Sequence, residues 1–176
     1  AGAGDRVTEL DELRTERLRL RRWRPEDAAP MAAINRDPDV TRYLNRPTDP
    51  PVVDAFHALA LEHWAVHGYG WWAVELRRGG FIGFAGVSHP VFLPAVADRP
   101  ELGWRLARAA WGLGYATEAA AAARDDALGR LGLGELISII HPENARSQSV
   151  ARKLGMAVET HVRHPVLDID VEIWRT

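Results

Sequence analysis

The sequence of 176 residues contains no cysteine. This absence excludes a thiol nucleophile, thiolate metal ligands and disulfide bonds. The chain also lacks an excess of one charge, because its formal net charge is only −2, so nothing draws it as a whole to nucleic acid or to an anionic membrane. No apolar run approaches the roughly 20 residues of a membrane span, and no secretion signal opens the chain. From these absences we expect a cytoplasmic protein without nucleic-acid or membrane partners.

The chain does have enough apolar residues for a packed core. Hydrophobic residues make up 47% of it, which excludes a wholly disordered protein. A length of 176 residues suits one domain, and we find no internal repeat, linker or block of like charge. The sequence therefore predicts a single domain over residues 1–176, in which residues 1–14 are a candidate flexible N-terminal extension.

Two kinds of hydrophobic periodicity alternate along the chain and predict an α/β fold. Residues 16–23 alternate leucine with arginine, as in a half-buried strand, and residues 70–89 resemble a hairpin that turns at Gly79 and Gly80. Residues 38–51 contain four prolines and are predicted to be a loop over a surface or cleft. Further strands are predicted at residues 99–107, 135–143, 158–164 and 168–175, and helices at residues 24–37, 52–67, 115–131 and 144–156.

A glycine-rich turn, "WGLGYAT" at residues 111–117, separates a predicted strand from an alanine-rich helix. A dinucleotide-binding fingerprint would need a third glycine where Thr117 stands, and a P-loop sequence occurs nowhere. Two interpretations remain open. The glycines turn the chain and do nothing else, or their bare amides and the helix N-terminus hold a pyrophosphate.

A second segment, "HPENARSQSVARKLGM" at residues 141–156, follows the buried strand of residues 135–143. It places Asn144 before a predicted helix, Ser147 in the first turn of that helix and Gly155 after its end. An asparagine helix cap with a glycine C-cap would explain both ends of this helix. It would not explain why this segment accompanies the glycine turn.

Three segments together resemble the GNAT superfamily of acyl-CoA-dependent N-acetyltransferases, and most of all its RimJ/RimL-type branch. They are "TERLRLRRWRPEDA", "ELGWRLARAAWGLGYATEA" and "NARSQSVARKLGM". The resemblance implies an α/β fold with a mixed, mostly antiparallel sheet of about six to seven strands flanked by about four helices. In this fold the sheet is splayed between the fourth and fifth strands, where the cofactor binds.

The resemblance also implies where acetyl-CoA lies. The family's pyrophosphate motif, Gln/Arg-x-x-Gly-x-Gly/Ala, falls on residues 111–116, with Trp111 in place of the usual Gln or Arg. Free backbone groups of residues 104–106 would pair with the pantetheine arm. Lys153 is a further candidate for a cofactor phosphate. The residues that the resemblance places at the cofactor are Trp104, Arg105, Leu106, Arg108, Trp111, Gly112, Leu113, Gly114, Tyr115, Ala116, Thr117, Asn144, Arg146 and Ser147.

Acetyl transfer to an amine needs a base for the ammonium and an acid for the leaving thiolate. By resemblance, Glu101 is the base and Ser147 is the acid, with His164 as a back-up base and His141 as a weaker one. For each of these residues a purely structural role is the alternative. "HWAVH" at residues 63–67 pairs two histidines at helical spacing but offers no third ligand, so we predict no metal site.

These residues lead to one expected function and one alternative. We expect direct transfer of acetyl from acetyl-CoA to a primary amine, either a protein N-terminus or a small-molecule amine, in a ternary complex. The alternative is a non-catalytic acyl-CoA-binding or interaction module with the same fold. Relatives are often dimers, so a homodimer stays open.

Overall fold

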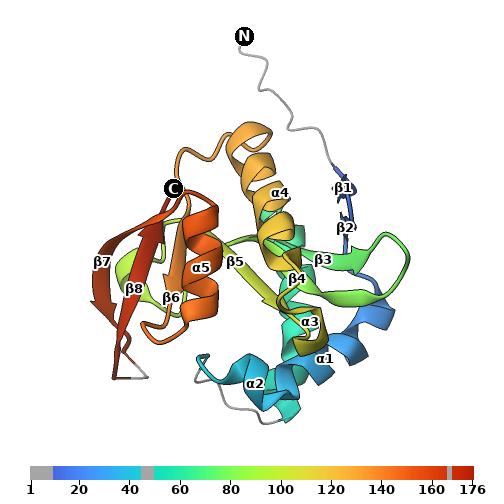
Figure 1. Ribbon diagram of the computed structural model, residues 1–176, viewed down its shortest axis with the longest axis horizontal. Helices are drawn as coiled ribbons and strands as arrows, with labels where there is room; N and C mark the ends of the chain where they lie inside the picture. Colours follow the sequence, from blue (N-terminus) through green and yellow to red (C-terminus); the bar gives the residue numbers. More distant parts are fainter. Residues whose placement is uncertain (1–9, 45–49, 166–167) are drawn as a thin grey trace.

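The computed structural model describes residues 10–44, 50–165 and 168–176, except for the side chains of residues 50–54. One eight-stranded sheet forms its centre, in the order β1-β2-β3-β4-β5-β6-β8-β7 (Figure 1). Neighbouring strands are antiparallel except β5 and β6, so the expected mixed, mostly antiparallel α/β fold is confirmed. The strands are β1 Glu12–Arg14, β2 Leu18–Arg21, β3 Trp71–Leu76, β4 Phe81–Ser88, β5 Glu101–Leu106, β6 Ile137–Ile140, β7 Ala157–Arg163 and β8 Asp170–Arg175.

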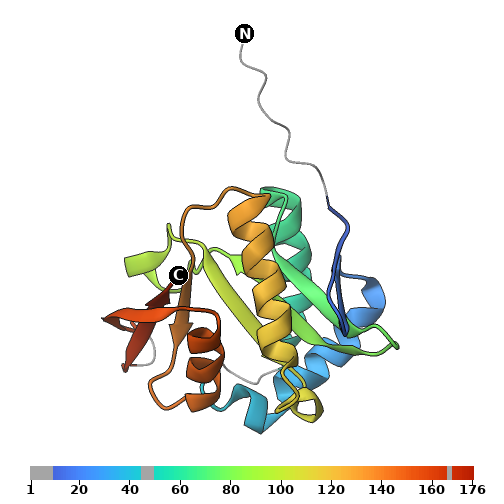
Figure 2. The same ribbon diagram turned by 45° about the horizontal axis from the view of Figure 1, so that its top comes forward.

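Helices cover both faces of this sheet. Helices α4 and α5 lie on one face, and α1 and α3 lie on the other (Figures 1 and 2). Helix α4 packs on the sheet through small side chains. Its residues Ala119, Ala120 and Ala123 have no more than 2% of their surface exposed, and their size lets the helix lie close to the strands. The α-helices are α1 Ala28–Arg36, α2 Pro38–Thr41, α3 Pro50–His67, α4 Tyr115–Gly129 and α5 Ala145–Lys153.

The sheet has one strand more than the six to seven expected. The additional strand is β1, which lies inside the segment that we expected to be a flexible extension. It pairs with β2 through a tight turn, in which the Thr15 hydroxyl accepts a hydrogen bond of 3.0 Å from the Leu18 amide. The interpretation of residues 12–14 as flexible was therefore wrong, while residues 1–9 lie outside the described part.

Both described ends of the proline-rich segment 38–51, which was predicted to be a loop, contain helix. Helix α2 begins at Pro38, whose fixed φ suits a first helical turn. The Asp37 side chain caps this helix by accepting a hydrogen bond of 2.9 Å from the Asp39 amide. Helix α3 already begins at Pro50, two residues before the predicted start, and residues 45–49 lie outside the description.

The sheet consists of two halves that meet along a very short seam. Strands β5 and β6 share a single register pair, Glu101 with Ile137, and diverge after it. When β1 is left out of the count, these are the fourth and fifth strands, which is where the resemblance placed the splay. The crossover from β5 to β6 runs through α4, so the mouth of the splay lies beside the start of this helix (Figure 2).

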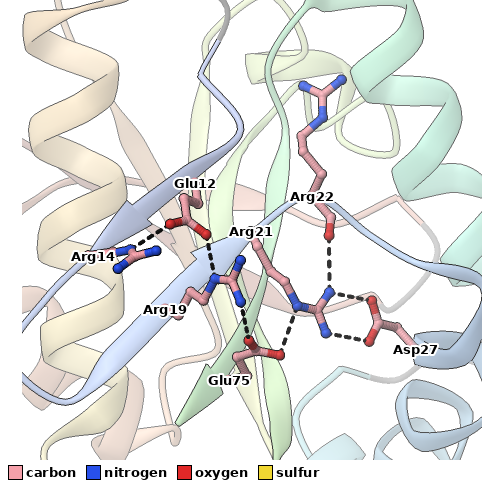
Figure 3. Close-up of polar contacts among 7 residues, drawn as sticks. All are labelled: Glu12, Arg14, Arg19, Arg21, Arg22, Asp27 and Glu75. Carbon is pink, nitrogen blue, oxygen red and sulfur yellow. Dashed lines mark hydrogen bonds and ion pairs between the residues drawn. The ribbon is translucent and has the colours of Figure 1, made fainter. Parts of the chain in front are cut away.

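A buried ion-pair network explains the arginine-rich first segment (Figure 3). Arg21, only 5% exposed, donates two hydrogen bonds of 2.7 and 2.9 Å to Asp27, which is 2% exposed. Its Nε donates to Glu75 at 2.8 Å. Burial would raise the pKa of Asp27, but the hydrogen bonds from Arg21 and from the Arg24 amide outweigh it and lower that pKa. This network ties β2 to β3 and to the start of α1.

A histidine cluster, formed by His63 and His67 of α3 and His89 after β4, occupies the opposite end of the sheet from the glycine turn. The His89 amide donates to His63 Nε2 at 3.3 Å, so His63 Nδ1 carries its proton toward the Tyr69 carbonyl, 2.9 Å away. Burial, followed by the neighbouring histidines, lowers the pKa of His63. The pKa of His89 is lowered for the same reasons. The folded protein therefore favours neutral rings at both positions.

We expect the stability of the protein to fall as the pH drops below about 6.5. Because the folded pKa values of His63 and His89 lie below the ordinary value of 6.5, the unfolded chain binds more protons in this window. The stabilisation is complete above pH 6.5 and is lost as the pH falls toward the folded pKa values. Melting temperatures measured between about pH 7.5 and 5 test this expectation. His63→Gln should flatten the slope, whereas His161→Gln, at an exposed position on β7, should not.

Candidate active site

One edge of β5 remains open along the splay. The Leu102 carbonyl faces β6, because it accepts a hydrogen bond of 2.6 Å from the Ser138 hydroxyl. Backbone groups alternate in direction along a strand, so those of Trp104 and Leu106 face the same side. The Leu106 carbonyl accepts a hydrogen bond of 2.9 Å from the Trp111 indole. The amide and carbonyl of Trp104 and the amide of Leu106 face this open edge, where a bound molecule can reach them.

Arg105 is placed differently from the sequence expectation. Its backbone faces β4, where it lies opposite Phe84, and its side chain donates to Asn35 of α1 at 2.6 Å. It therefore points to the face of the sheet that carries α1 and α3. The geometry favours Trp104 and Leu106 over Arg105 as residues that line the splay.

The glycine turn is shaped to present backbone amides. Gly112 and Gly114 have φ values of 74° and 82°, a left-handed conformation that favours glycine. Helix α4 begins directly after Gly114, and its first intrahelical bond runs from the Glu118 amide to the Gly114 carbonyl, at 3.0 Å. Within the described part of the chain, the amides of residues 112–117 donate no hydrogen bond. The positive end of the helix dipole adds to these donors, so the turn can bind an anion.

Across the mouth of the splay lies the start of α5. The Asn144 side chain accepts a hydrogen bond of 3.1 Å from the Ser147 amide, so it is a helix cap, and its NH2 group can donate to another partner. The Ser147 side chain is half-buried, and among the described residues its hydroxyl has no hydrogen-bond partner. Both residues lie at the start of α5 with a polar group available, and their contact with a molecule in the splay stays a prediction.

Trp111 connects the two sides of this mouth. The Arg146 guanidinium lies 4.7 Å from the centre of its ring, and that of Arg108 lies 5.8 Å away. Arg108 also pairs with Asp39 of α2 on the exposed surface. Lys153, in contrast, lies at the last turn of α5, about 12 Å along the helix from its first residue, so it is not part of this group.

The three candidate bases occupy separate places. Glu101 is half-buried at the seam between β5 and β6, on the same face as Arg105. His164 is buried in the β7–β8 connection and stacks on Phe92, at 5.9 Å between ring centres. His141 accepts a hydrogen bond of 3.1 Å from the Glu143 amide. Of the three, Glu101 adjoins the point where the splay opens.

Arg17, which was not among the predicted site residues, reaches the glycine turn from the β1–β2 connection. Its side chain donates to the Leu113 carbonyl at 2.8 Å and to Glu118 at 2.7 Å. Its only signal in the sequence was its place in "TERLRLR", where the alternating pattern assigned it to the exposed face of a strand. No local pattern indicates a contact with a residue 96 positions away.

Residues 17–157, which include β5, the glycine turn and α5, match the family described as "Acetyltransferase (GNAT) domain". The chain belongs to this GNAT family. Two curated proteins are similar over most of their length. Protein YkkB of Bacillus subtilis (strain 168) is 32% identical over 162 residues, which cover 86% of this chain and 88% of YkkB. N-acetyltransferase p20 of Bacillus licheniformis is 29% identical, over 88% of this chain and 86% of that protein.

Solved GNAT structures share the fold over nearly the whole chain. An acetyltransferase from Agrobacterium tumefaciens str. C58 superposes with a TM-score of 0.83 at 30% identity and covers 99% of both chains. Spermidine N-acetyltransferase from Vibrio cholerae, solved with CoA and spermine, has a TM-score of 0.74 at 17% identity over 92% of this chain and 96% of that one. At that identity the likeness concerns the fold alone. Among the described residues of the GNAT chain, no helix has the length and apolar character to cross a bilayer.

Proposed function

We propose that this GNAT protein transfers the acetyl group of acetyl-CoA directly to a primary amine in a ternary complex. The observation that carries the proposal is the row of unbonded amides at residues 112–117, beside the open edge of β5. This arrangement suits a ligand with a pyrophosphate at one end and an extended polar arm. A GNAT relative solved with CoA supports the same choice.

The residues of the splay have separate tasks in binding. The amides of residues 112–117 hold the two phosphoryl groups, and Arg146 adds positive charge from the side of α5. Asn144 donates its NH2 group to the pantetheine arm. The Trp104 amide donates to the thioester carbonyl oxygen, where negative charge develops during attack. Holding the amine against this carbonyl supplies a large part of the rate, because it replaces a collision by a fixed geometry.

Two side chains move the protons. The Glu101 carboxylate accepts a proton from the substrate ammonium, directly or through one water molecule. The neutral amine then attacks the thioester carbon, and the C–S bond breaks as the tetrahedral intermediate collapses. The Ser147 hydroxyl donates a proton to the leaving thiolate, and it takes up in return the second proton that the attacking nitrogen loses as it becomes an amide. The products are an acetamide and CoA, and the chain has no cysteine that could carry the acetyl group in between.

For the acceptor, we propose a primary amine of either a protein N-terminus or a small molecule. The RimJ/RimL-type segments of the sequence favour the first, whereas the spermidine N-acetyltransferase from Vibrio cholerae, which shares the fold, acts on a polyamine. The acceptor approaches from the face of α1 and α3, toward which Glu101 and Arg105 point.

The proposal is tested by calorimetry with CoA and by an assay of thiol release. Because the protein has no cysteine, any thiol that appears comes from CoA. We expect binding of CoA, and thiol release from acetyl-CoA that depends on added amine, in a panel of N-terminal peptides, polyamines and aminoglycosides. Binding without release on any amine would instead identify a non-catalytic acyl-CoA-binding module. No heat on addition of CoA would remove the proposal altogether.

A further inference from the structure

Arg17 contacts the glycine turn and the adjoining first turn of α4 through one guanidinium group. Its Nη1 donates to the Leu113 carbonyl at 2.8 Å, and its Nε donates to Glu118 Oε2 at 2.7 Å. The guanidinium carbon also lies 4.6 Å from the centre of the Tyr115 ring. A Cβ atom on Gly114 would stand 3.2 Å from Arg17 Nη2, so the side chain lies directly against the turn.

The bond to Leu113 fixes the direction of an amide that the cofactor is proposed to use. The Leu113 carbonyl and the Gly114 N–H belong to one planar, trans peptide group and therefore point in opposite directions. Because Arg17 holds this carbonyl on its own side, the Gly114 N–H is aimed away from Arg17. This peptide is followed by Gly114 at a φ of 82°, and glycine, which has no Cβ, hinders rotation about its own φ least. The hydrogen bond supplies the restraint that this glycine lacks.

Arg17 is itself held in place. Glu118 accepts hydrogen bonds from the Arg17 amide at 2.9 Å and from the Thr15 hydroxyl at 2.5 Å. Burial would raise the pKa of Glu118, yet these bonds and the one from the Arg17 side chain lower it. The carboxylate is therefore ionised at neutral pH and offsets the positive charge of Arg17. This balance favours a role in shaping the turn over a direct grip on a phosphate.

We propose that Arg17 is a positioning residue, which orients the Leu113–Gly114 peptide so that its amide faces the pyrophosphate of the bound acetyl-CoA. This inference rests on the proposed function. It assigns a cofactor-dependent role to a side chain of the β1–β2 turn, which lies outside the pyrophosphate motif. The role concerns the pyrophosphate end of the ligand and not the acetyl group.

The experiment compares a complete donor with a truncated one. The Kd of CoA is measured for wild type and for Arg17→Met. Steady-state constants of both proteins are then measured with acetyl-CoA and with S-acetylpantetheine, which lacks the pyrophosphate. We expect Arg17→Met to raise the Kd of CoA and the KM of acetyl-CoA by about tenfold to a hundredfold, the scale of one charged hydrogen bond. The kcat at saturating acetyl-CoA and the kcat/KM of S-acetylpantetheine should stay within about twofold of wild type, because neither depends on the pyrophosphate.

Two further variants separate positioning from folding. Arg17→Lys keeps a donor for the Leu113 carbonyl and should restore part of the affinity for CoA. If Arg17→Met fails to fold, Arg17→Lys takes its place in the comparison of the two donors. Arg19→Met removes the next arginine on the same segment, which pairs with Glu12 and Glu75 away from the turn, and should leave the Kd of CoA unchanged.

Each outcome decides the inference. Equal losses with both donors, or an unchanged Kd of CoA in both Arg17 variants, would overturn the role of Arg17 while the proposed function stands. A wild-type protein that binds no CoA would overturn both.

Discussion

Glu101→Gln will lower kcat by about 10²- to 10⁴-fold at neutral pH, the usual contribution of a positioned general base. Glutamine has nearly the same shape as glutamate but cannot accept the proton of the ammonium. The backbone pairing of Glu101 with Ser88 and Ile137 does not involve the side chain and should persist. We therefore expect the Kd of CoA to remain at the wild-type value. Steady-state kinetics and calorimetry on the same preparation provide both numbers.

The pH dependence of the defect gives an independent check. As the pH approaches the pKa of the acceptor, solution removes the proton without the enzyme, so the deficit of Glu101→Gln should shrink. This recovery begins near the ordinary pKa of the acceptor, which is about 8 for an α-amine and about 10 for a lysine-like amine. The variant thus also distinguishes the two acceptor classes. A deficit that stays constant with pH, or full activity at neutral pH, would contradict the assignment of Glu101 as base.

Asp27→Asn will destabilise the fold by about 3–5 kcal/mol, because removal of one partner leaves a buried charge without compensation. The charge left behind is that of Arg21, whose side chain is 6% exposed and whose pKa the hydrogen bond to Asp27 raises. Glu75 would remain as a second partner at 2.8 Å, which sets the effect at the lower part of the range. Urea denaturation followed by circular dichroism measures the change in the free energy of unfolding.

Controls for this prediction come from the same network (Figure 3). Glu12→Gln alters the pairs of Glu12 with Arg14 and Arg19, which are more exposed than the Arg21–Asp27 pair, and should have little measurable effect on unfolding. The double change Arg21→Met with Asp27→Leu removes both buried charges and should recover much of the loss. The lowered pKa of Asp27 also predicts how stability depends on pH. The ionised carboxylate stabilises the folded protein above the ordinary pKa of 3.8, and this contribution is lost as the pH falls through the folded pKa. Equal stability of Asp27→Asn and wild type would show that burial of this pair is neutral.

Local patterns in the sequence predicted the elements of the fold better than their contacts. The two-residue alternation in residues 16–23 and the glycines at 79 and 80 are local signals, and the corresponding strands and turn were found. The short strand β1 was missed because three residues are too few to show a period. The splay came from the resemblance, since no periodicity states which strand edges are left open.

The candidate site shows the same division. The motif at residues 111–116 led to the turn, to its glycines and to the start of α4. Alternation along β5, with Glu101 at its start, follows from the strand itself, but the position of Arg105 against Asn35 depends on how α1 packs. The contact between Arg17 and Leu113 joins two segments that only the folded sheet brings together.

The single residue pair between β5 and β6 leaves little backbone pairing between the two halves of the sheet. A ligand that spans the splay would contact both halves and so add to the few interactions between β5 and β6. By mass action, a ligand at about a hundredfold its Kd adds about 2.7 kcal/mol to the stability of the state that binds it. If acetyl-CoA binds there, as proposed, the free energy of unfolding rises with the concentration of acetyl-CoA.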